Sequence, residues 1–221
     1  MHRYPTLIAV AHGTRSANGR RQLQELAAAV ARRRPGLDVR LCYVDVQEPK
    51  VAAIVPSTPH AVVVPLLLSA GYHVRVDIAE AVAGTNVPVT APLGPDPVLL
   101  ESLTRNLPAA DAVVLAAAGS SDPGWRADVE SFAAALPGRA RVGYVSGTGP
   151  RVPDVVARLR ADGAKRVAIA AYLLADGLFY RSLGNAGADS VTPPLCRDVA
   201  VADLVLGRFD SALLTTAGSR L

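Results

Sequence analysis

Three side chains of metal-binding type follow three predicted strands in the first half of this 221-residue chain. His12 comes directly after the apolar run at residues 7–11, Glu48 follows a second predicted strand, and His73 lies in the loop after a third. Two histidines and one carboxylate, with coordination positions left over, form a common open site for Fe²⁺, Co²⁺, Ni²⁺ or Zn²⁺. These residue types therefore predict a divalent-metal site if the fold brings the three side chains together.

The elements predicted around these residues would place them at one edge of a sheet. Apolar runs bounded by turn residues indicate strands, with an irregularity at Pro65, over residues 7–11, 38–46, 60–68 and 87–93. Apolar residues at helical spacing indicate a short helix ending near Val82 and helices over residues 20–34, 50–55 and 97–107. This alternation is typical of a parallel, doubly wound sheet, in which right-handed crossovers bring the loops after the strands to one edge. Ligands of α/β proteins bind outside that edge.

The second half of the chain repeats the pattern of the first half. Residues 114–121 match residues 8–15 and place Ala118 opposite His12, and residues 173–181 match residues 67–75 and place Phe179 opposite His73. Both pairs are 106 residues apart, from 12 to 118 and from 73 to 179. Residues 144–150 match residues 43–49 at a spacing of 101, from 48 to 149, and place Gly149 opposite Glu48. The alternative is a chance similarity between two halves that are both rich in alanine and valine.

We therefore predict an α/β fold of two similar Rossmann-like halves, each with a mostly parallel four-stranded sheet flanked by helices. Residues 1–107 would form the domain with the metal site, and residues 108–221 a degenerate repeat. Every candidate ligand is present in the first copy only, so the fold itself does not require a histidine or a carboxylate at these strand ends. This difference favours a functional role for the three residues. The last predicted helix, at residues 198–216, could pack on either half.

Composition and charge exclude several classes of protein. Half of the residues are hydrophobic and 19% are charged, which is enough for a sizeable core. The net charge of +4 comes from dispersed basic residues, and aromatic residues make up only 5% of the chain, so we expect no nucleic-acid binding. No apolar run is long enough to cross a membrane. Cys42 and Cys196 are far apart and in no metal or redox spacing, which indicates a reduced, cytoplasmic protein.

Three motifs of the chain resemble those of the sirohydrochlorin chelatase family. The run His12-Gly13-Thr14-Arg15-Ser16 is similar to the opening motif of that family, and residues 65–78, with Gly71-Tyr72-His73 at their centre, resemble its second histidine motif. Glu48-Pro49 resembles the acidic position of the family. The resemblance covers the whole chain, because long bacterial members also consist of two α/β halves. The chain has Ala79, where many members have proline, and it lacks the histidine-rich tail or loop that some members carry.

This resemblance implies a class II tetrapyrrole chelatase, a lyase that inserts Fe²⁺ or Co²⁺ into sirohydrochlorin without nucleotide. The product would be siroheme or cobalt-sirohydrochlorin, on the pathways of siroheme or cobalamin biosynthesis. The macrocycle would lie in a cleft between the two halves, and the protein would be a monomer or a homodimer. The sequence contains no Gly-x4-Gly-Lys-Ser/Thr phosphate loop, which agrees with an activity that needs no nucleotide.

The mechanism expected for such an enzyme assigns both metal binding and catalysis to His12, Glu48 and His73. These residues would hold the cation over the ring, and a neutral histidine would accept a proton from a pyrrole N–H group. The substrate-binding residues would be Arg15, Ser16, Tyr72 and Arg75, and Arg181 and Phe179 are further candidates. Ser16 has the alternative role of capping the first helix. Asp77 would either orient His73 or cap the helix that follows it.

Two other functions fit part of the pattern. A phosphatase with a histidine nucleophile also carries a His-Gly-Thr motif, but it normally has an arginine beside the histidine, where this chain has Ala11. A non-catalytic carrier of metal or tetrapyrrole would use the same ligands as a chelatase, and only turnover would separate the two. The ligand types do not choose between iron and cobalt.

Overall fold

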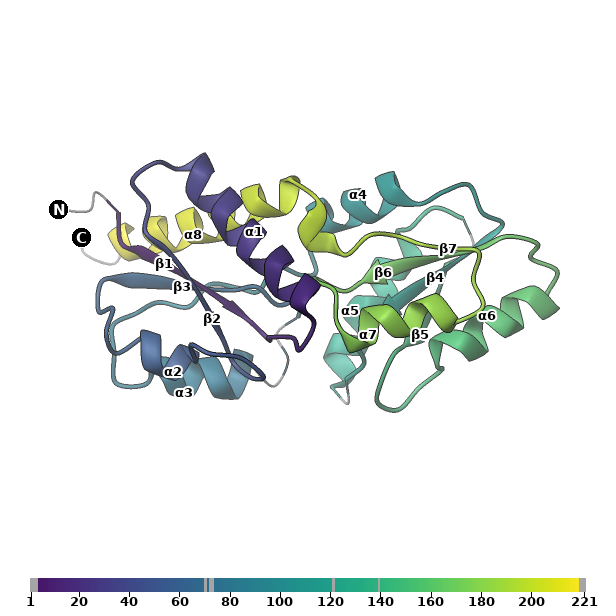
Figure 1. Cartoon of the computed structure of the whole chain (residues 1–221), viewed down its shortest axis with the longest axis horizontal. Coiled ribbons are helices and arrows are strands. Elements are labelled where there is room, and N and C mark those ends of the chain that lie inside the picture. The colour runs from purple at the N-terminus through teal and green to yellow at the C-terminus, as the bar shows by residue number, and fades with distance from the viewer. Residues whose placement is uncertain (1–3, 70, 72–73, 121, 139, 219–221) are drawn as a thin grey trace. The chain divides into compact units, whose positions relative to one another are not determined.

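The computed structural model describes residues 4–69, 71, 74–120, 122–138 and 140–218. The chain folds into two compact units. Unit 1 consists of Met1–Gly94 together with Asp198–Leu221, and unit 2 consists of Pro95–Arg197. The expected α/β class is confirmed, because each unit contains a parallel sheet with helices on both of its faces (Figure 1).

The sheet of unit 1 has three parallel strands over the described residues, in the order β2-β1-β3. Helices α1 and α8 cover one face of this sheet, and helices α2 and α3 cover the other (Figure 1). A turn of π-helix, η1, leads directly into α3. In chain order the elements of unit 1 are β1 (Thr6–Ala11), α1 (Ala17–Arg33), β2 (Val39–Tyr43), α2 (Val51–Ile54), β3 (Ala61–Pro65), η1 (Val74–Ile78), α3 (Ala79–Val82) and α8 (Ala200–Gly218).

Local sequence explains the central strand of unit 1 and the helix that follows it. All six residues of β1 are buried, as expected for a strand with a parallel neighbour on each side and helices on both faces. Helix α1 begins after Ser16, whose Oγ accepts a hydrogen bond from the Gly19 amide at 3.2 Å. Its apolar stripe is buried, and two arginines in its last turn interact favourably with the helix dipole.

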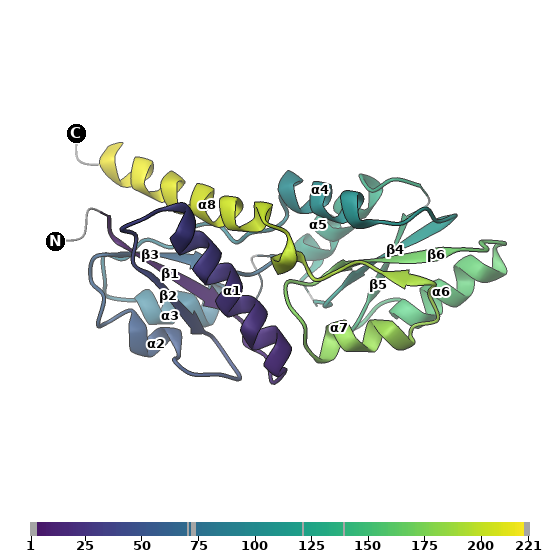
Figure 2. The same ribbon diagram turned by 45° about the horizontal axis from the view of Figure 1, so that its top comes forward.

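The sheet of unit 2 has four parallel strands in the described part of the chain, in the order β5-β4-β6-β7. Helices α4 and α5 lie on one face, and α6 and α7 lie on the other (Figure 2). In chain order its elements are α4 (Pro97–Asn106), β4 (Ala112–Ala117), α5 (Pro123–Ala134), β5 (Ala140–Tyr144), α6 (Val152–Ala161), β6 (Val167–Tyr172), α7 (Leu178–Ser182), η2 (Leu183–Asn185), β7 (Ser190–Val191) and η3 (Leu195–Arg197).

The prediction of a fourth strand at residues 87–93 of the first half is wrong. The structure reduces it to a single parallel bridge between Val63 and Val89, supported by hydrogen bonds from the Val63 amide to the Pro88 carbonyl and from the Thr90 amide to the Val63 carbonyl. Proline has no N–H group, so Pro88 and Pro92 cannot donate to a ladder. The first sheet therefore stops at three strands among the described residues.

The predicted division after residue 107 also differs from the structure. Helix α4, the last helix of the first repeat, belongs to unit 2, where it packs on β6. Helix α8, the last helix of the second repeat, belongs to unit 1, where it packs on α1 and β3. This arrangement answers the question about the last helix that the sequence left open. Each repeat thus gives its final helix to the other unit.

Apolar burial and ion pairs hold α8 on unit 1. Val201, Val205 and Phe209 of α8 have no exposed surface. Arg33 Nε lies 2.6 Å from Asp203 Oδ1, and the Arg34 guanidinium bonds both carboxylate oxygens of Asp210, at 2.5 and 2.8 Å. These contacts explain why this helix packs beside α1, as Figures 1 and 2 both show.

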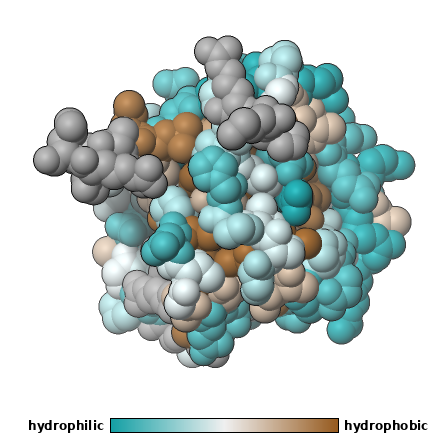
Figure 3. Space-filling model, turned by 90° about the vertical axis from the view of Figure 1, so that its left-hand side faces the viewer, coloured by the Kyte–Doolittle hydropathy of each residue, from teal (hydrophilic) through white to brown (hydrophobic). Residues whose placement is uncertain are grey.

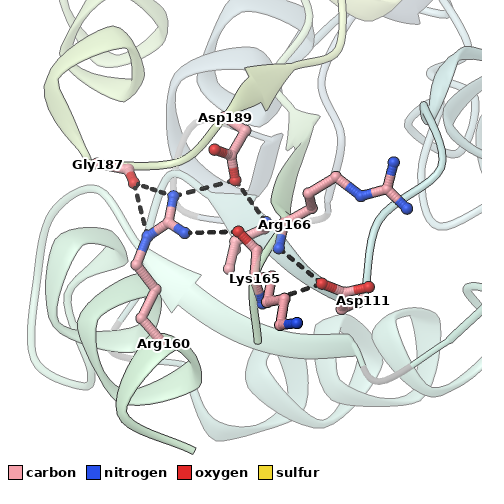
Figure 4. Close-up of polar contacts among 7 residues, drawn as sticks. Asp111, Arg160, Lys165, Arg166, Gly187 and Asp189 are labelled. Carbon is pink, nitrogen blue, oxygen red and sulfur yellow. Dashed lines mark hydrogen bonds and ion pairs between the residues drawn. The ribbon is translucent and has the colours of Figure 1, made fainter. Parts of the chain in front are cut away.

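A polar network ties together the strands of unit 2 at their amino ends (Figure 4). Asp111, just before β4, accepts hydrogen bonds from the amides of Lys165 and Arg166 at 2.9 and 2.7 Å. Asp189, just before β7, accepts one from the Val167 amide at 2.7 Å and one from the Arg160 guanidinium at 3.0 Å. Asp111 thus ties the start of β4 to the residues just before β6, and Asp189 ties the start of β7 to the first residue of β6.

The surface of unit 1 at the amino ends of its strands is mostly hydrophilic, with small groups of hydrophobic residues between the polar ones (Figure 3). No helix in the described part of the chain is long and apolar enough to span a membrane.

Candidate metal-binding site

The loops after β1 and β2 are joined by backbone hydrogen bonds at His12 and at the residue before it. The Val44 amide donates to the Ala11 carbonyl at 3.0 Å, and the Asp45 amide donates to the His12 carbonyl at 3.1 Å. Gly13 has a φ of +100°, and a Cβ atom at this position would lie 2.4 Å from the Asp45 carbonyl oxygen. Only glycine allows both this backbone conformation and this close approach. The glycine of the His-Gly-Thr motif therefore has a structural task, which is to let the two loops touch.

The His12 imidazole is exposed at the carboxyl end of β1. Its Nδ1 atom lies 3.3 Å from the Gly13 carbonyl oxygen. A carbonyl oxygen only accepts hydrogen bonds, so this contact fits the tautomer that carries its proton on Nδ1 and its lone pair on Nε2. A histidine held in this tautomer by a backbone carbonyl is the form that ligates metals through Nε2.

Glu48 lies exposed in the loop between β2 and α2. Its Oε2 atom accepts a hydrogen bond from the Lys50 amide at 2.8 Å, and no other partner for the carboxylate lies within the described residues. The Glu48–Pro49 peptide bond is cis. The hydrogen bond from the Lys50 amide fixes one carboxylate oxygen of Glu48, and this restricts where the other oxygen can point.

Gln47, which the sequence analysis did not single out, joins the two loops. Its Oε1 atom accepts a hydrogen bond from the Thr14 amide at 2.8 Å, and its side chain is also hydrogen-bonded to the Tyr43 hydroxyl. Burial raises the pKa of Tyr43, and the bond from Gln47 offsets part of that rise. Gln47 therefore positions the residues on either side of it, although nothing in its type or spacing marks it in the sequence.

The backbone of the second loop is strained beside these residues. Val46 has a φ of 63°, an outlier for a β-branched residue, and its amide donates to Asp45 Oδ1 at 2.7 Å. The corresponding position of the second repeat is Gly147, with a φ of 75°. The first repeat thus keeps a strained valine where the second has an unstrained glycine, and such strain is typical of functional loops.

The structure describes only some of the remaining predicted site residues. Ser16 caps α1, and its predicted contact with substrate stays a prediction. Arg15 is exposed and has no hydrogen bond or ion pair with the residues that the structure describes. Tyr72 and His73 lie outside the described residues, and so does the side chain of Arg75, whose backbone belongs to η1. No group of three or more His, Cys, Asp or Glu side chains suited to a metal occurs among the described residues, which do not include His73.

Asp77 lies in η1, which runs into α3 without a break. The residue at the N-cap of α3 is Ile78, whose side chain makes no capping hydrogen bond. Both predicted roles of Asp77, orienting His73 and capping the helix that follows it, stay predictions.

The repeat predicted from the sequence is confirmed in the backbone at the same edge of unit 2. The Val145 amide donates to the Ala117 carbonyl at 2.9 Å, and the Ser146 amide donates to the Ala118 carbonyl at 2.8 Å. Gly119 has a φ of +105°, and a Cβ atom there would lie 2.1 Å from the Ser146 carbonyl oxygen. These contacts match those of Val44, Asp45 and Gly13, so the fold builds this edge with Ala118 as well as with His12.

The loop after β6 corresponds to the second histidine motif and contains no metal-binding side chain at the matching position. Phe179 stands where the first repeat has His73, and Leu178 beside it is 83% exposed. Arg181, a candidate for substrate contact, pairs with the buried Asp176 at 3.1 Å. This arginine therefore has a structural partner, and its contact with substrate stays a prediction.

Fold and site together define a duplicated α/β protein of the chelatase type, with the candidate metal ligands in the first repeat only. The chain belongs to the CbiX family, whose model matches residues 6–110 and again residues 112–211. The two matches confirm the internal repeat, and the boundary between them lies close to the one predicted after residue 107. The resemblance to the sirohydrochlorin chelatase family is thereby confirmed.

Individual proteins similar to this chain also belong among the sirohydrochlorin chelatases by name. The sirohydrochlorin ferrochelatase of Bacillus subtilis is 26% identical, over 80% of this chain and 77% of that protein. Among solved structures, SirB from Bacillus subtilis with Fe³⁺ has a TM-score of 0.77 at 19% identity, over 97% of this chain and 98% of that one. CbiX, described as the terminal enzyme of siroheme biosynthesis in denitrifying bacteria, has a TM-score of 0.68 at 19% identity, over 94% and 99% of the two chains. At these identities the structural matches establish the fold.

Proposed function

We propose that this protein is a sirohydrochlorin chelatase that inserts a divalent metal ion, Fe²⁺ or Co²⁺, into the tetrapyrrole without nucleotide. Membership of the CbiX family and the name of the curated relative support this activity. One observation carries the site assignment. Two repeats build the same loop contacts at the carboxyl ends of their strands, but His12 and Glu48 in the first are replaced by Ala118 and Gly149 in the second.

The metal ion is a substrate of this reaction, and we propose His12, Glu48 and His73 as its ligands. His12 would bind the ion through Nε2, which carries the lone pair in the tautomer whose Nδ1–H group donates to the Gly13 carbonyl. The Glu48 carboxylate supplies an oxygen ligand and offsets the charge of the cation. This mixed nitrogen and oxygen set suits Fe²⁺ and Co²⁺ and leaves coordination positions open for the ring nitrogens.

Insertion requires that two pyrrole N–H groups lose their protons as two metal–nitrogen bonds to those atoms form. Each histidine that releases the ion regains a lone pair on its ring nitrogen, and this lone pair accepts a proton from the macrocycle. The charge of the ion lowers the cost of removing these protons. His12 and His73 thus hold the ion first and accept protons afterwards, and Arg15 and Arg75 would bind carboxylates of the substrate. The cleft predicted between the two halves stays a prediction.

The test is anaerobic absorbance spectroscopy of sirohydrochlorin with purified protein and either Co²⁺ or Fe²⁺. We expect metal-dependent turnover well above the rate without protein, and a loss of at least tenfold in His12→Ala and in Glu48→Gln. His60→Ala is the matched control, because His60 is an exposed histidine outside the site. Full activity of His12→Ala would contradict the ligand assignment. Tight binding of ring or metal without turnover would establish the carrier function instead.

A further inference from the structure

One arginine has different surroundings in the two repeats. Arg20 in the first turn of α1 and Arg126 in the first turn of α5 are 106 residues apart, from 20 to 126, the same spacing as that between His12 and Ala118. Both arginines therefore stand at the same place in the fold, beside the edge that carries the proposed metal ligands in the first repeat.

In unit 2, Arg126 holds the two strand-end loops together. Its Nε atom donates to the Ser120 carbonyl at 2.9 Å, and an Nη atom donates to the carbonyl and the hydroxyl of Thr148 at 2.6 and 2.5 Å. The guanidinium also lies over the Tyr144 ring, 5.7 Å from its centre. All of these contacts are structural, because they join the loop after β4 to the loop after β5.

In unit 1, Gln47 performs this joining task. It bonds the Thr14 amide and the Tyr43 hydroxyl, and these residues correspond to Ser120 and Tyr144. The exposed guanidinium of Arg20 has no hydrogen bond and no ion pair with the described residues. It still lies close enough to the end of β2 for its charge to act on the Tyr43 hydroxyl. The first turn of α1 contains no acidic residue that would pair with it.

We propose that Arg20 is a substrate-positioning residue that binds a carboxylate of the tetrapyrrole at the metal edge of unit 1. The inference rests on the proposed function and extends it to a residue outside the recognised motifs. A guanidinium binds a carboxylate through paired N–H groups, and such a bond is stronger than one between neutral groups. Gln47 leaves the arginine available for this role, because the loops are already joined without it.

The experiment compares Arg20→Gln, Arg20→Lys and Arg21→Gln by titrating the metal-free ring, sirohydrochlorin alone, into each purified full-length protein. Arg21 is the matched control, because it is the next arginine on α1 and bonds Asn18 Oδ1 at 2.8 Å instead. For Arg20→Gln we expect the Kd to rise about three- to tenfold, the range for one exposed charged hydrogen bond. Arg20→Lys should recover part of this loss, Arg21→Gln should bind like the wild type, and added salt should narrow the difference.

Thermal unfolding separates this role from a structural one. Arg20→Gln should melt at the same temperature as the wild type, whereas Arg126→Gln should melt lower because it loses three hydrogen bonds within unit 2. Equal ring affinities of Arg20→Gln and Arg21→Gln, in a protein whose wild type binds and metallates the ring, would overturn the role of Arg20 alone. A wild type that does not bind the ring would overturn the proposed function and this role with it.

Discussion

At the scale of single residues, Gln47 links the proposed ligands His12 and Glu48. Its side chain bonds the Thr14 amide, two residues after His12, and the Tyr43 hydroxyl at the end of β2. Glu48 is the next residue in the chain. Such a residue contributes to function through the position of its neighbours and does not itself need to touch metal or substrate.

We predict that Gln47→Ala lowers both the stability and the metal affinity of the protein. The half-buried Thr14 amide and the hydroxyl of the buried Tyr43 would each lose a partner, which costs about 1–2 kcal/mol of unfolding free energy. Urea unfolding and Co²⁺ titration would measure the two effects. Gln24→Ala is the control, because Gln24 is exposed on α1 and has no contact of this kind with described residues. Equal unfolding midpoints for the two variants would contradict the linking role.

At the scale of elements, the glycine after β1 sets the distance between two loops. We predict that Gly13→Ala and Gly119→Ala each destabilise the protein by about 1–3 kcal/mol, because both positions combine a positive φ with a carbonyl oxygen less than 3 Å from the new Cβ. Gly36→Ala should cost less, because Gly36 has a φ of +87° but nothing within 4 Å. Denaturant unfolding of the three variants gives the comparison.

The same glycine variants separate the effect of these loop contacts on stability from their effect on metal binding. Only Gly13→Ala moves the loops that carry His12 and Glu48, so only this variant should also weaken Co²⁺ binding under conditions where all three remain folded. A Gly119→Ala variant with an equal loss of metal affinity would contradict the assignment of the ligands to the first repeat.

Strand β7 depends on a charged carboxylate, so its contribution to stability changes with pH. The hydrogen bond from the Val167 amide, together with Arg160, holds the pKa of Asp189 below its ordinary value. A lowered folded pKa stabilises the fold above the unfolded pKa of about 3.9, and this contribution is lost as the pH falls through the folded pKa.

We predict that Asp189→Asn lowers the urea midpoint at neutral pH, and that the difference from the wild type shrinks as the pH falls from about 5 to about 2. Asp162→Asn is the control, because the side chain of Asp162 is exposed and has no partner among the described residues. A difference between wild type and Asp189→Asn that does not depend on pH would show that the charge of Asp189 is not involved.

At the scale of the whole molecule, each repeat gives its last helix to the other unit. A fragment of residues 1–107 lacks α8, whose buried Val201, Val205 and Phe209 each contribute about 1.5–3 kcal/mol. We predict that this fragment does not unfold cooperatively, whereas residues 95–197, which form all of unit 2, do. Circular dichroism during heating would measure both, and a cooperative transition in residues 1–107 would contradict the importance of the exchange.

Much of the candidate site was predictable, because its signals are local. A buried strand is an apolar run, and the polar residue that ends it lies at the carboxyl edge of a parallel sheet. These rules placed His12 and Glu48 at strand ends, and the sequence pattern shared by the two repeats predicted that Ala118 and Gly149 occupy the same places. Gln47 and Arg20 could not be found in this way, since their importance lies in which loop each side chain reaches.

The sequence by itself determined the α/β class, the internal repeat, the family and the candidate ligands, because periodicity and spacing carry this information along the chain. The tertiary structure decided the rest. An apolar helix face indicates that α4 and α8 must be covered, but only the folded chain shows which sheet covers them. Pro88 and Pro92 lie within an apolar run that resembles a strand. Their missing N–H groups matter only where a neighbouring strand needs a hydrogen-bond donor, and the folded chain decides where that is. Long-range contacts have no local signature, and so the exchange of helices and the different tasks of Arg20 and Arg126 appear only in three dimensions.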